Sequence, residues 1–401
     1  MSVTLDDIRA ARERIGSHIY HSPCPYSLSL SRLCDAEIYC KLDHLQMTGS
    51  FKERGARNRL MALSADQKAT GVIAASAGNH ALGLAYHGQL LGVPVTVVMP
   101  KWAPIVKVAN TRSFGANVIQ HGESFDEARR YAIALGEERK LTFVSAYDDP
   151  HIIAGQGTLG LEILEDVPDV DAVVVPVGGG GLIAGIGLVI KALRPSVRII
   201  GVEPAHAASM TESLRVGKPT KVATHPTLAD GLAVAEPGKL CFEIAKNVID
   251  QLLVVDEAQI ALSILRLLEL EKTVVEGAGA VPLAAVMDPA VDLRGKKVVL
   301  LLCGGNIDVT MISRVIERGL AADGRLCRFT VAISDRPGSL ASLTTVLAAT
   351  GASIKEIVHD RHFGPADVAR VAVTCLLETR DAAHIAEVRA ALGQAKISIV
   401  G

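Results

Sequence analysis

Aromatic side chains are scarce in this chain of 401 residues: they make up 3% of it, with a single tryptophan. Proteins that hold single-stranded nucleic acid commonly stack bases on aromatic rings, so this scarcity argues against such a partner. The formal net charge is only −2, which gives no electrostatic reason to expect DNA, RNA or an anionic membrane. We therefore expect partners that are small molecules.

The seven cysteines are odd in number and include no C-x-x-C pair, so they indicate neither a zinc site nor a disulfide framework. The longest apolar runs, such as "VVLLLC", are far shorter than the roughly 20 residues that cross a bilayer. The N-terminal stretch "MSVTLDDIRAARERIG" predicts a charged amphipathic helix and not a signal peptide. We expect a cytoplasmic protein without a membrane or nucleic-acid partner.

Apolar residues are plentiful, at 49% of the chain, and they occur in short β-rich runs separated by helical patterns. The runs "GVIAAS", "VPVTVVMP", "DAVVVPVG", "VRIIGVE", "QLLVV" and "KKVVLLLCGG" are mostly apolar throughout, which is typical of strands buried on both faces. Between them, "DEAQIALSILRLLELEK" has Asp256 as a candidate N-cap and one apolar face. This alternation predicts parallel sheets with helices on both sides, in an open α/β body of two lobes over residues 1–322.

The pattern changes after residue 322, where a polar joint precedes a strand, a turn, a helix and another strand. A third strand, a helix around residues 382–392 and the terminal strand "KISIV" follow. The order β-α-β-β-α-β over residues 326–401 predicts a ferredoxin-like module. A module of this size needs docking or pairing to bury its elements, which favours a homo-oligomer.

Lys52 lies in "TGSFKERGA", behind a small hydroxylated stretch. A lysine that forms a Schiff base with an aldehyde needs a lowered pKa and room beside its nitrogen, and small neighbours provide that room. Taken alone, a lysine at the start of a helix is more often a solvated surface residue. The motif becomes informative only together with others.

Three further stretches join a predicted strand to a predicted helix through small residues. In "ASAGNHALG" the loop can present backbone N–H groups to a carboxylate, although an ordinary strand-to-helix turn explains it more simply. In "VPVGGGGLIAGIG" four consecutive glycines carry a large entropic cost, which favours an anion site at the helix N-terminus. In "LLLCGGN" the strand ends at Cys303, a residue type that is more often a small apolar part of the core. Ligands bind beyond the carboxyl ends of parallel strands, so these stretches should share one crevice.

These stretches, in this order and together with "GVEP", resemble the fold-type II pyridoxal-phosphate enzymes, which have a two-lobed, tryptophan-synthase-β-like α/β fold. The resemblance is closest to the threonine/serine dehydratase branch, which also contains serine racemase, and spans nearly all of residues 5–320. Each motif alone is common, but five collinear matches are specific. The C-terminal module, with "DRPGSLA", resembles an ACT domain, a regulatory amino-acid-binding unit. The combination is similar to threonine ammonia-lyases that carry one such domain.

The resemblance implies a role for each matching residue. Lys52 would carry pyridoxal 5'-phosphate and act as the catalytic base, Asn79 would bond the phenolic oxygen of the cofactor, and Cys303 would lie against its pyridine nitrogen. The phosphate would be bound by the backbone of Gly178, Gly179, Gly180, Gly181 and Leu182. The substrate carboxylate would be bound by Ser76, Gly78, Asn79 and His80.

By the same resemblance, the reaction would convert L-threonine to 2-oxobutanoate and ammonia, as in isoleucine biosynthesis, and L-serine to pyruvate. Two other functions stay open: a related lyase or racemase acting on serine or 3-hydroxyaspartate, and a non-catalytic amino-acid sensor. Ala77 stands where serine racemases have a second acid/base serine, which favours dehydration over racemisation.

Two further sites follow from the resemblance. Related enzymes hold a divalent cation at positions that align with Glu203, Ala207 and Ser209, but one carboxylate is a poor ligand set for Mg²⁺ or Ca²⁺, so we expect a monovalent cation or no metal. The turn "DRPGS" would bind an amino-acid effector through Asp335, Pro337, Gly338 and Ser339, because a helix N-terminus attracts a carboxylate. ACT-like modules usually pair, so we expect a homodimer or homotetramer.

Overall fold

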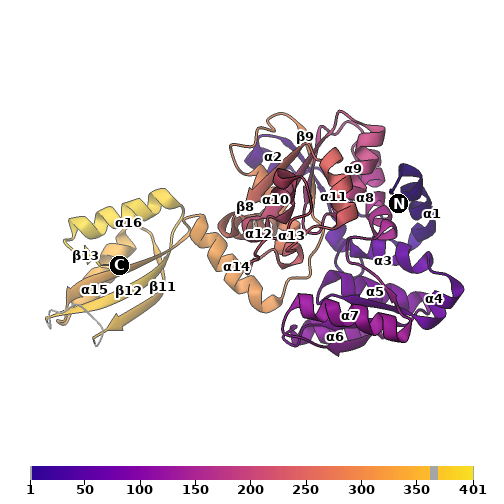
Figure 1. Ribbon diagram of the computed structural model, residues 1–401. Helices are drawn as coiled ribbons and strands as arrows, with labels where there is room; N and C mark the ends of the chain where they lie inside the picture. The colour runs from indigo at the N-terminus through magenta and orange to yellow at the C-terminus, as the bar shows by residue number, and fades with distance from the viewer. Residues whose placement is uncertain (1, 362–368, 401) are drawn as a thin grey trace. The chain divides into compact units, whose positions relative to one another are not determined.

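The structure, a computed structural model, describes residues 2–361 and 369–400 of the chain. Two compact units make up the chain, Met1–Asp308 and Val309–Gly401 (Figure 1). The helix α14 (Val309–Ala322) therefore belongs to the C-terminal unit, whereas the sequence placed these residues in the N-terminal body. Across the described part of the chain, we find no helix with the length and hydropathy that a membrane span requires.

One lobe of the N-terminal unit is built on a four-stranded parallel sheet with the order β4-β3-β2-β5. One face of this sheet, with Ile73 and Val98, packs against α7, and the other face, with Ala74 and Val97, packs against α3 and α5. The strands are β2 (Val72–Ala75), β3 (Val95–Met99), β4 (Asn117–Gln120) and β5 (Thr142–Phe143). The helices are α3 (Lys52–Met61), α4 (Ala65–Thr70), α5 (Asn79–Leu91), α6 (Ile105–Ser113) and α7 (Phe125–Arg139).

The second lobe is built on a five-stranded parallel sheet with the order β1-β9-β6-β7-β8. Helices α8, α9 and α11 pack against Val173 and Val299, and α13, which is buried throughout, contacts β6 to β9. The strands are β1 (Glu37–Lys41), β6 (Ala172–Pro176), β7 (Arg198–Pro204), β8 (Gln251–Val255) and β9 (Lys297–Leu301). The helices are α1 (Leu5–Ile15), α2 (Leu28–Cys34), α8 (Pro150–Asp166), α9 (Gly181–Leu193), α10 (Ser209–Val216), α11 (Lys239–Val248), α12 (Glu257–Leu270) and α13 (Gly277–Val286).

The predicted α/β fold is confirmed. Each of the six apolar runs contains a strand of one of the two parallel sheets, and every position of β6 is buried, as expected for a strand covered on both faces. Asp256 caps α12 through a capping box: its side chain accepts from the amide of Gln259, and Gln259 bonds the amide of Asp256. Short 3₁₀ turns connect several elements: η1 (Gly16–His18), η2 (Asp43–Leu45), η3 (Ala205–Ala207) and η4 (Asp230–Leu232).

The C-terminal unit follows α14 with a four-stranded antiparallel sheet of order β11-β12-β10-β13. The elements occur in the predicted order β-α-β-β-α-β, and Leu343 and Leu347 of one helix and Val388 and Leu392 of the other pack on the sheet. The fold is ferredoxin-like, as the ACT resemblance implied. The elements are β10 (Leu326–Ser334), α15 (Ser339–Ala349), β11 (Ser353–Asp360), β12 (Arg370–Glu378), α16 (Ala382–Gln394) and β13 (Ser398–Ile399).

Candidate active site

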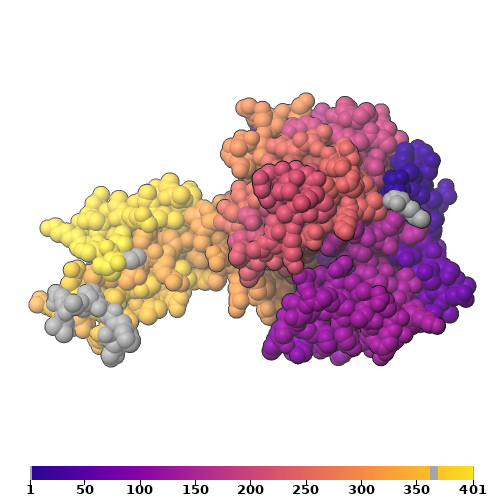
Figure 2. All heavy atoms as spheres, viewed as in Figure 1, coloured from indigo at the N-terminus to yellow at the C-terminus, as the bar shows by residue number. Residues whose placement is uncertain are grey.

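A cavity of about 960 Å³ lies where the carboxyl ends of strands from both parallel sheets converge. On the molecular surface, the purple segment with α6 and α7 meets the red segments of the second lobe along a groove at this place (Figure 2). All the residues that the sequence assigned to cofactor or substrate line this one cavity: Lys52, Ser76, Gly78, Asn79, His80, Gly178, Gly179, Gly180, Gly181, Leu182 and Cys303.

Lys52 is the first residue of α3, and its side chain enters the cavity, where Nζ donates to the carbonyl oxygen of Ala146 at 3.0 Å. The lysine is only partly exposed. Burial lowers its pKa to about 8, although the neighbouring groups Cys303, Cys241 and Glu276 oppose the shift. A large share of the amine is therefore neutral near pH 8, which is the form that can attack a carbonyl or accept a proton.

The glycine loop between β6 and α9 lines the cavity. Gly180 has a φ of +92° and precedes the first residue of α9, a conformation that favours glycine. A Cβ atom at Gly179 would lie 2.3 Å from Cγ of Tyr147, so the ring of Tyr147 covers the loop. A helix N-terminus that borders a cavity is suited to an anion such as a phosphate.

A second helix N-terminus beside the cavity already has a carboxylate. Asp148 accepts from the backbone amides of Lys239, Leu240 and Cys241 at the start of α11, at 3.1, 2.9 and 3.2 Å. Among the described residues, no carboxylate bonds the first amides of α9 in this way. Of these two positive helix ends, α9 is thus the one whose amides can bind a ligand anion.

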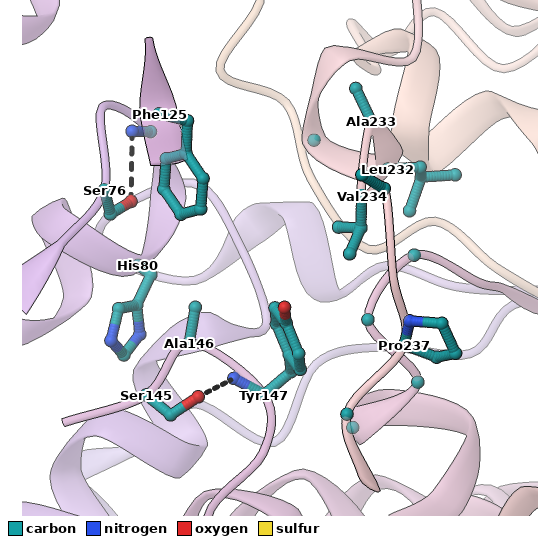
Figure 3. Close-up of a pocket in the computed structure, with 18 of the residues that line it drawn as sticks. Ser76, His80, Phe125, Ser145, Ala146, Tyr147, Leu232, Ala233, Val234 and Pro237 are labelled. Carbon is teal, nitrogen blue, oxygen red and sulfur yellow. Dashed lines mark hydrogen bonds between the residues drawn. The ribbon is translucent and has the colours of Figure 1, made fainter. Parts of the chain in front are cut away.

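The loop between β2 and α5 presents small groups to the cavity. Ser76 Oγ accepts from the amide of Gly78 at 3.3 Å (Figure 3). His80 Nε2 lies 3.3 Å from the carbonyl oxygen of Val144, and burial, assisted by the nearby Lys52, lowers the pKa of His80 to about 3. The imidazole of His80 is therefore neutral. A substrate carboxylate at this place would accept hydrogen bonds from the amides at the start of α5 and from the Ser76 hydroxyl, without help from a charged imidazolium.

Cys303 follows β9 and is 2% exposed. Its Sγ lies 3.9 Å from the carbonyl oxygen of Ala278, and burial raises the pKa of the thiol well above its usual value. Cys303 is therefore a neutral thiol at the wall of the cavity. This is the uncharged partner that the sequence assigned to the pyridine nitrogen of the cofactor.

Among the lining residues that sequence reasoning did not assign to the site are Glu276 and Tyr147. Glu276 precedes α13 and bonds the side chain of Asn79, from which it is separated by 197 positions. Tyr147 covers the glycine loop, and its phenolic oxygen points into the space between Phe125 and Val234 (Figure 3). Neither residue lies in a glycine-rich strand end, so the signal that located the other residues did not include them.

The helix α3 is fixed by a buried ion network. Arg54, two positions after Lys52, is completely buried, and it donates to Asp43 Oδ2 from Nε at 3.0 Å and to Glu162 Oε2 from Nη2 at 2.9 Å. Lys41, also completely buried, contacts Glu162 at 2.7 Å. Breaking such a pair would leave an uncompensated buried charge, so α3 has little freedom to shift.

The predicted metal and effector residues are not among the residues that line the cavity. Both oxygens of Glu203 accept hydrogen bonds at the start of α10, from Met210 and Thr211, and the described residues contain no cluster of metal-ligating side chains. In the C-terminal unit, Gly338, with φ +90°, precedes α15, which begins at Ser339. Asp335 bonds Arg361 at 3.1 Å, and Pro337 completes the turn.

Comparison with known families gives a match to the pyridoxal-phosphate dependent enzymes over residues 15–304. The chain belongs to this family. Its members use pyridoxal phosphate, which is therefore the cofactor of this protein. The matched range contains every residue that lines the cavity, from Phe51 to Cys303.

Individual relatives cover nearly the whole chain. An L-threonine ammonia-lyase from Thermotoga maritima is 46% identical over 390 residues, which is 97% of both chains. Among solved structures, the processed form of threonine deaminase isoform 2 from Solanum lycopersicum has a TM-score of 0.74 at 37% identity, and covers 78% of this chain and 92% of its own. Maize serine racemase has a TM-score of 0.75 at 32% identity, and covers 80% of this chain and 99% of its own.

The cavity of this pyridoxal-phosphate enzyme fits its cofactor on three physical grounds. A lysine amine with a lowered pKa lies inside it, as a Schiff-base residue requires. The open amides of α9 and the glycine loop suit a phosphate. The ring of Tyr147 lies where any side chain at Gly179 would be, so the close approach of the loop backbone depends on glycine.

Proposed function

We propose that the protein is a pyridoxal-phosphate dependent dehydratase and deaminase. It would convert L-threonine to 2-oxobutanoate and ammonia, and L-serine to pyruvate. The observation that carries this proposal is the placement of the Lys52 amine in one cavity with the glycine loop and the loop from Ser76 to His80. The relationship to an L-threonine ammonia-lyase along 97% of the chain supports the choice of threonine.

In this proposal four groups would hold the cofactor. Lys52 would hold it covalently, and the backbone of the glycine loop, from Gly178 to Leu182, would hold its phosphate. Asn79 would bond the phenolic oxygen. Cys303, a neutral thiol, would contact the pyridine nitrogen without supplying a charge.

Pyridoxal phosphate, when bound, supplies an electron sink that makes the α-proton of an attached amino acid removable. Lys52 takes that proton at its Nζ, once its amine is free. The pKa of about 8 lets the neutral base form at physiological pH, and the Ala146 carbonyl 3.0 Å away orients the amine. Ser76 and the amides at the start of α5 hold the substrate carboxylate, which fixes the α-carbon beside Lys52.

Racemisation and reaction with 3-hydroxyaspartate are less well supported. Ala77 lines the cavity, and its methyl group cannot deliver a proton to the opposite face of the α-carbon. A second substrate carboxylate, as in 3-hydroxyaspartate, would need a cationic side chain as its partner. Lys107 lines the cavity but already pairs with Asp230, also a lining residue, at 2.9 Å. Loss of the β-hydroxyl is therefore the outcome that these residues favour.

For the C-terminal unit we propose an ACT regulatory role. An amino-acid effector would bind the turn of Asp335, Pro337, Gly338 and Ser339, where the start of α15 offers amides without a side-chain cap. Pairing of two such units would give a homodimer or homotetramer. We also propose that the enzyme works in the cytoplasm, with its seven cysteines as free thiols.

The test compares keto-acid formation from threonine, serine and 3-hydroxyaspartate, with and without isoleucine or valine, for the wild type and Lys52→Ala. We expect threonine to be the best substrate, and the variant to lose at least about 1,000-fold in turnover because it lacks both tether and base. Lys101→Ala, which removes an exposed lysine paired with Glu123, should match the wild type. Activity of Lys52→Ala comparable to that of the wild type would overturn the proposal. A wild-type protein that forms no keto acid from any of the three substrates would instead support the role of a non-catalytic sensor.

A further inference from the structure

Glu276 is a buried carboxylate at the wall of the cavity, and the proposed reaction gives it no role. It is 5% exposed and lines the cavity. Its Oε1 accepts from Nδ2 of Asn79 at 2.7 Å, and its Oε2 accepts from the backbone amide of Asn306 at 3.1 Å. Gly304 packs closely against this carboxylate, since a Cβ atom there would lie 2.2 Å from Oε1.

A chain of directional hydrogen bonds ends at this carboxylate. Nδ2 of Asn306 donates to the carbonyl oxygen of Thr48 at 2.7 Å and to Oδ1 of Asn79 at 2.8 Å. The Thr48 carbonyl is only an acceptor, so Asn306 must direct its NH₂ group there. Asn79 must then direct its Oδ1 toward Asn306, and the Nδ2 of Asn79 therefore points to Glu276.

Glu276 completes this order because both of its oxygens face donors. A rotated Asn79 would place Oδ1 against the carboxylate and Nδ2 against the NH₂ group of Asn306, so both contacts would be repulsive. The observed orientation uses one hydrogen of Asn79 Nδ2 for Glu276. The second hydrogen bonds no described residue, and Asn79 lines the cavity.

We propose that Glu276 is a positioning residue that fixes the Asn79 carboxamide with its free N–H available to the phenolic oxygen of pyridoxal phosphate. The inference rests on the proposed function, which assigns Asn79 to that oxygen. Glu276 touches neither cofactor nor substrate in this role. It acts through Asn79 alone.

The ionised carboxylate is the form that can accept both bonds. Burial, with Asp230 on η4, raises the pKa of Glu276 to about 7, whereas the bonds from Asn79 and Asn306 and the charge of Lys107 on α6 oppose that shift. The Lys52 amine and the Cys303 thiol also interact electrostatically with Glu276, and the nearby titratable groups include His80 on α5 and His44 beside Gly305. At pH 8 the ionised form predominates, so the test is made there.

The test uses Glu276→Gln, Asn79→Ala and the double variant, each loaded with pyridoxal phosphate at pH 8. Glutamine has the shape of glutamate but offers one acceptor and one NH₂ group, so one of the two donors it faces loses its partner. The measured quantities are the absorption spectrum of the bound cofactor and its dissociation constant from the apoprotein. We expect the same spectral change in both single variants and about a tenfold weaker cofactor affinity. The double variant should show no further change.

Two matched variants accompany the cycle. Asn306→Ala removes the bond to Asn79 Oδ1 without removing a charge, and should give the same spectral change even if Glu276→Gln fails to fold. Glu243→Gln, which changes an exposed carboxylate on α11 that pairs with Lys246 and does not line the cavity, should leave the spectrum unchanged. Additive effects in the double variant, or a wild-type spectrum in both Glu276→Gln and Asn306→Ala, would overturn the inference.

Failure of the proposed function is a separate result. The spectra and affinities need only bound cofactor, whereas threonine turnover by the wild type tests the reaction. A wild type that forms no keto acid, with variants that share one spectral change, would refute the reaction and support the positioning role.

Discussion

Lys52 illustrates how a fold alters the chemistry of one side chain. The amine lies at the wall of the cavity and donates a hydrogen bond to the carbonyl oxygen of Ala146 at 3.0 Å. Its lowered pKa means that the folded apoprotein binds a proton less readily than the unfolded chain does. The site is therefore built at the expense of stability, as is common for functional residues.

This cost predicts that Lys52→Met stabilises the apoprotein at neutral pH. The pKa of Lys52 is about 8 in the folded state and 10.5 in its ordinary setting, so the penalty is fully present below pH 8 and disappears as the pH rises toward 10.5. We expect a gain of about 2 kcal/mol at pH 7, reduced from the full shift because cavity water reaches the amine. Urea unfolding of both apoproteins at pH 7 and pH 9.5 measures it, and a gain that does not shrink with pH would contradict the explanation.

The sequence predicted the site residues that lie in recognisable short motifs, and it missed a residue that does not lie in one. Lys52, Asn79 and Cys303 lie in short stretches whose small neighbours indicated a site, and the structure brings all three to one cavity. Glu276 lies in "VVEGAGAVP", where it looks like the start of a helix. Its role depends on a contact across 197 positions, which no local pattern contains.

Among the elements, the glycine loop before α9 combines two constraints. Gly180 needs a positive φ, and a Cβ atom there would lie 2.8 Å from Cε of Met210 and 3.0 Å from Cβ of Cys241. Gly217 also has a positive φ, of +83°, but a Cβ atom there has nothing within 4 Å. Comparing substitutions at Gly180 and Gly217 therefore distinguishes the effect of an unfavourable backbone conformation from the effect of a steric clash.

We expect Gly180→Ala to lose about 1–2 kcal/mol of stability from its conformation and to bind pyridoxal phosphate at least about tenfold more weakly. The loop must shift to relieve the crowding, which moves its amides away from the phosphate. Gly217→Ala should lose similar stability with unchanged cofactor affinity. Thermal unfolding and fluorescence titration of the apoproteins measure both effects, and equal cofactor affinity in the two variants would contradict a phosphate site at this loop.

The prediction of elements succeeded for runs that are apolar at most positions. Each of the six runs contains a strand, and β2 and β6 are buried at every position. In β8 only Val255 is buried, but its apolar residues were sufficient to indicate a strand. Strands β1, β4 and β5 were not predicted: β4 has exposed or partly exposed residues, and β5 has only two residues. The helix α14 joins the C-terminal unit because of its packing with β10, which its own periodicity does not reveal.

For the whole molecule, the cavity is lined only by residues up to Cys303, which lie within the unit that ends at Asp308. Catalysis and regulation would therefore reside in separate units, each with its own hydrophobic core. That separation leads to a prediction about truncation.

A chain that ends at residue 308 should keep threonine turnover within about threefold of the full chain and lose any response to an amino-acid effector. Steady-state kinetics with and without isoleucine or valine measure both properties, and size-exclusion chromatography shows whether the oligomer persists. A folded, cofactor-loaded truncation that still responds to the effector would place the regulatory site in the N-terminal unit.

The buried network around Arg54 also has a consequence for the speed of catalysis. Since Asp43 and Glu162 hold α3 in place, the backbone of Lys52 would stay fixed if its amine leaves and rejoins a bound cofactor, as proposed. The movement of the Lys52 amine would then need only rotations within its own side chain. Such rotations take nanoseconds or less at exposed positions, whereas shifts of whole helices take microseconds or longer. Turnover would be limited by bond breaking, by closure of the lobes or by product release, and not by the travel of the lysine.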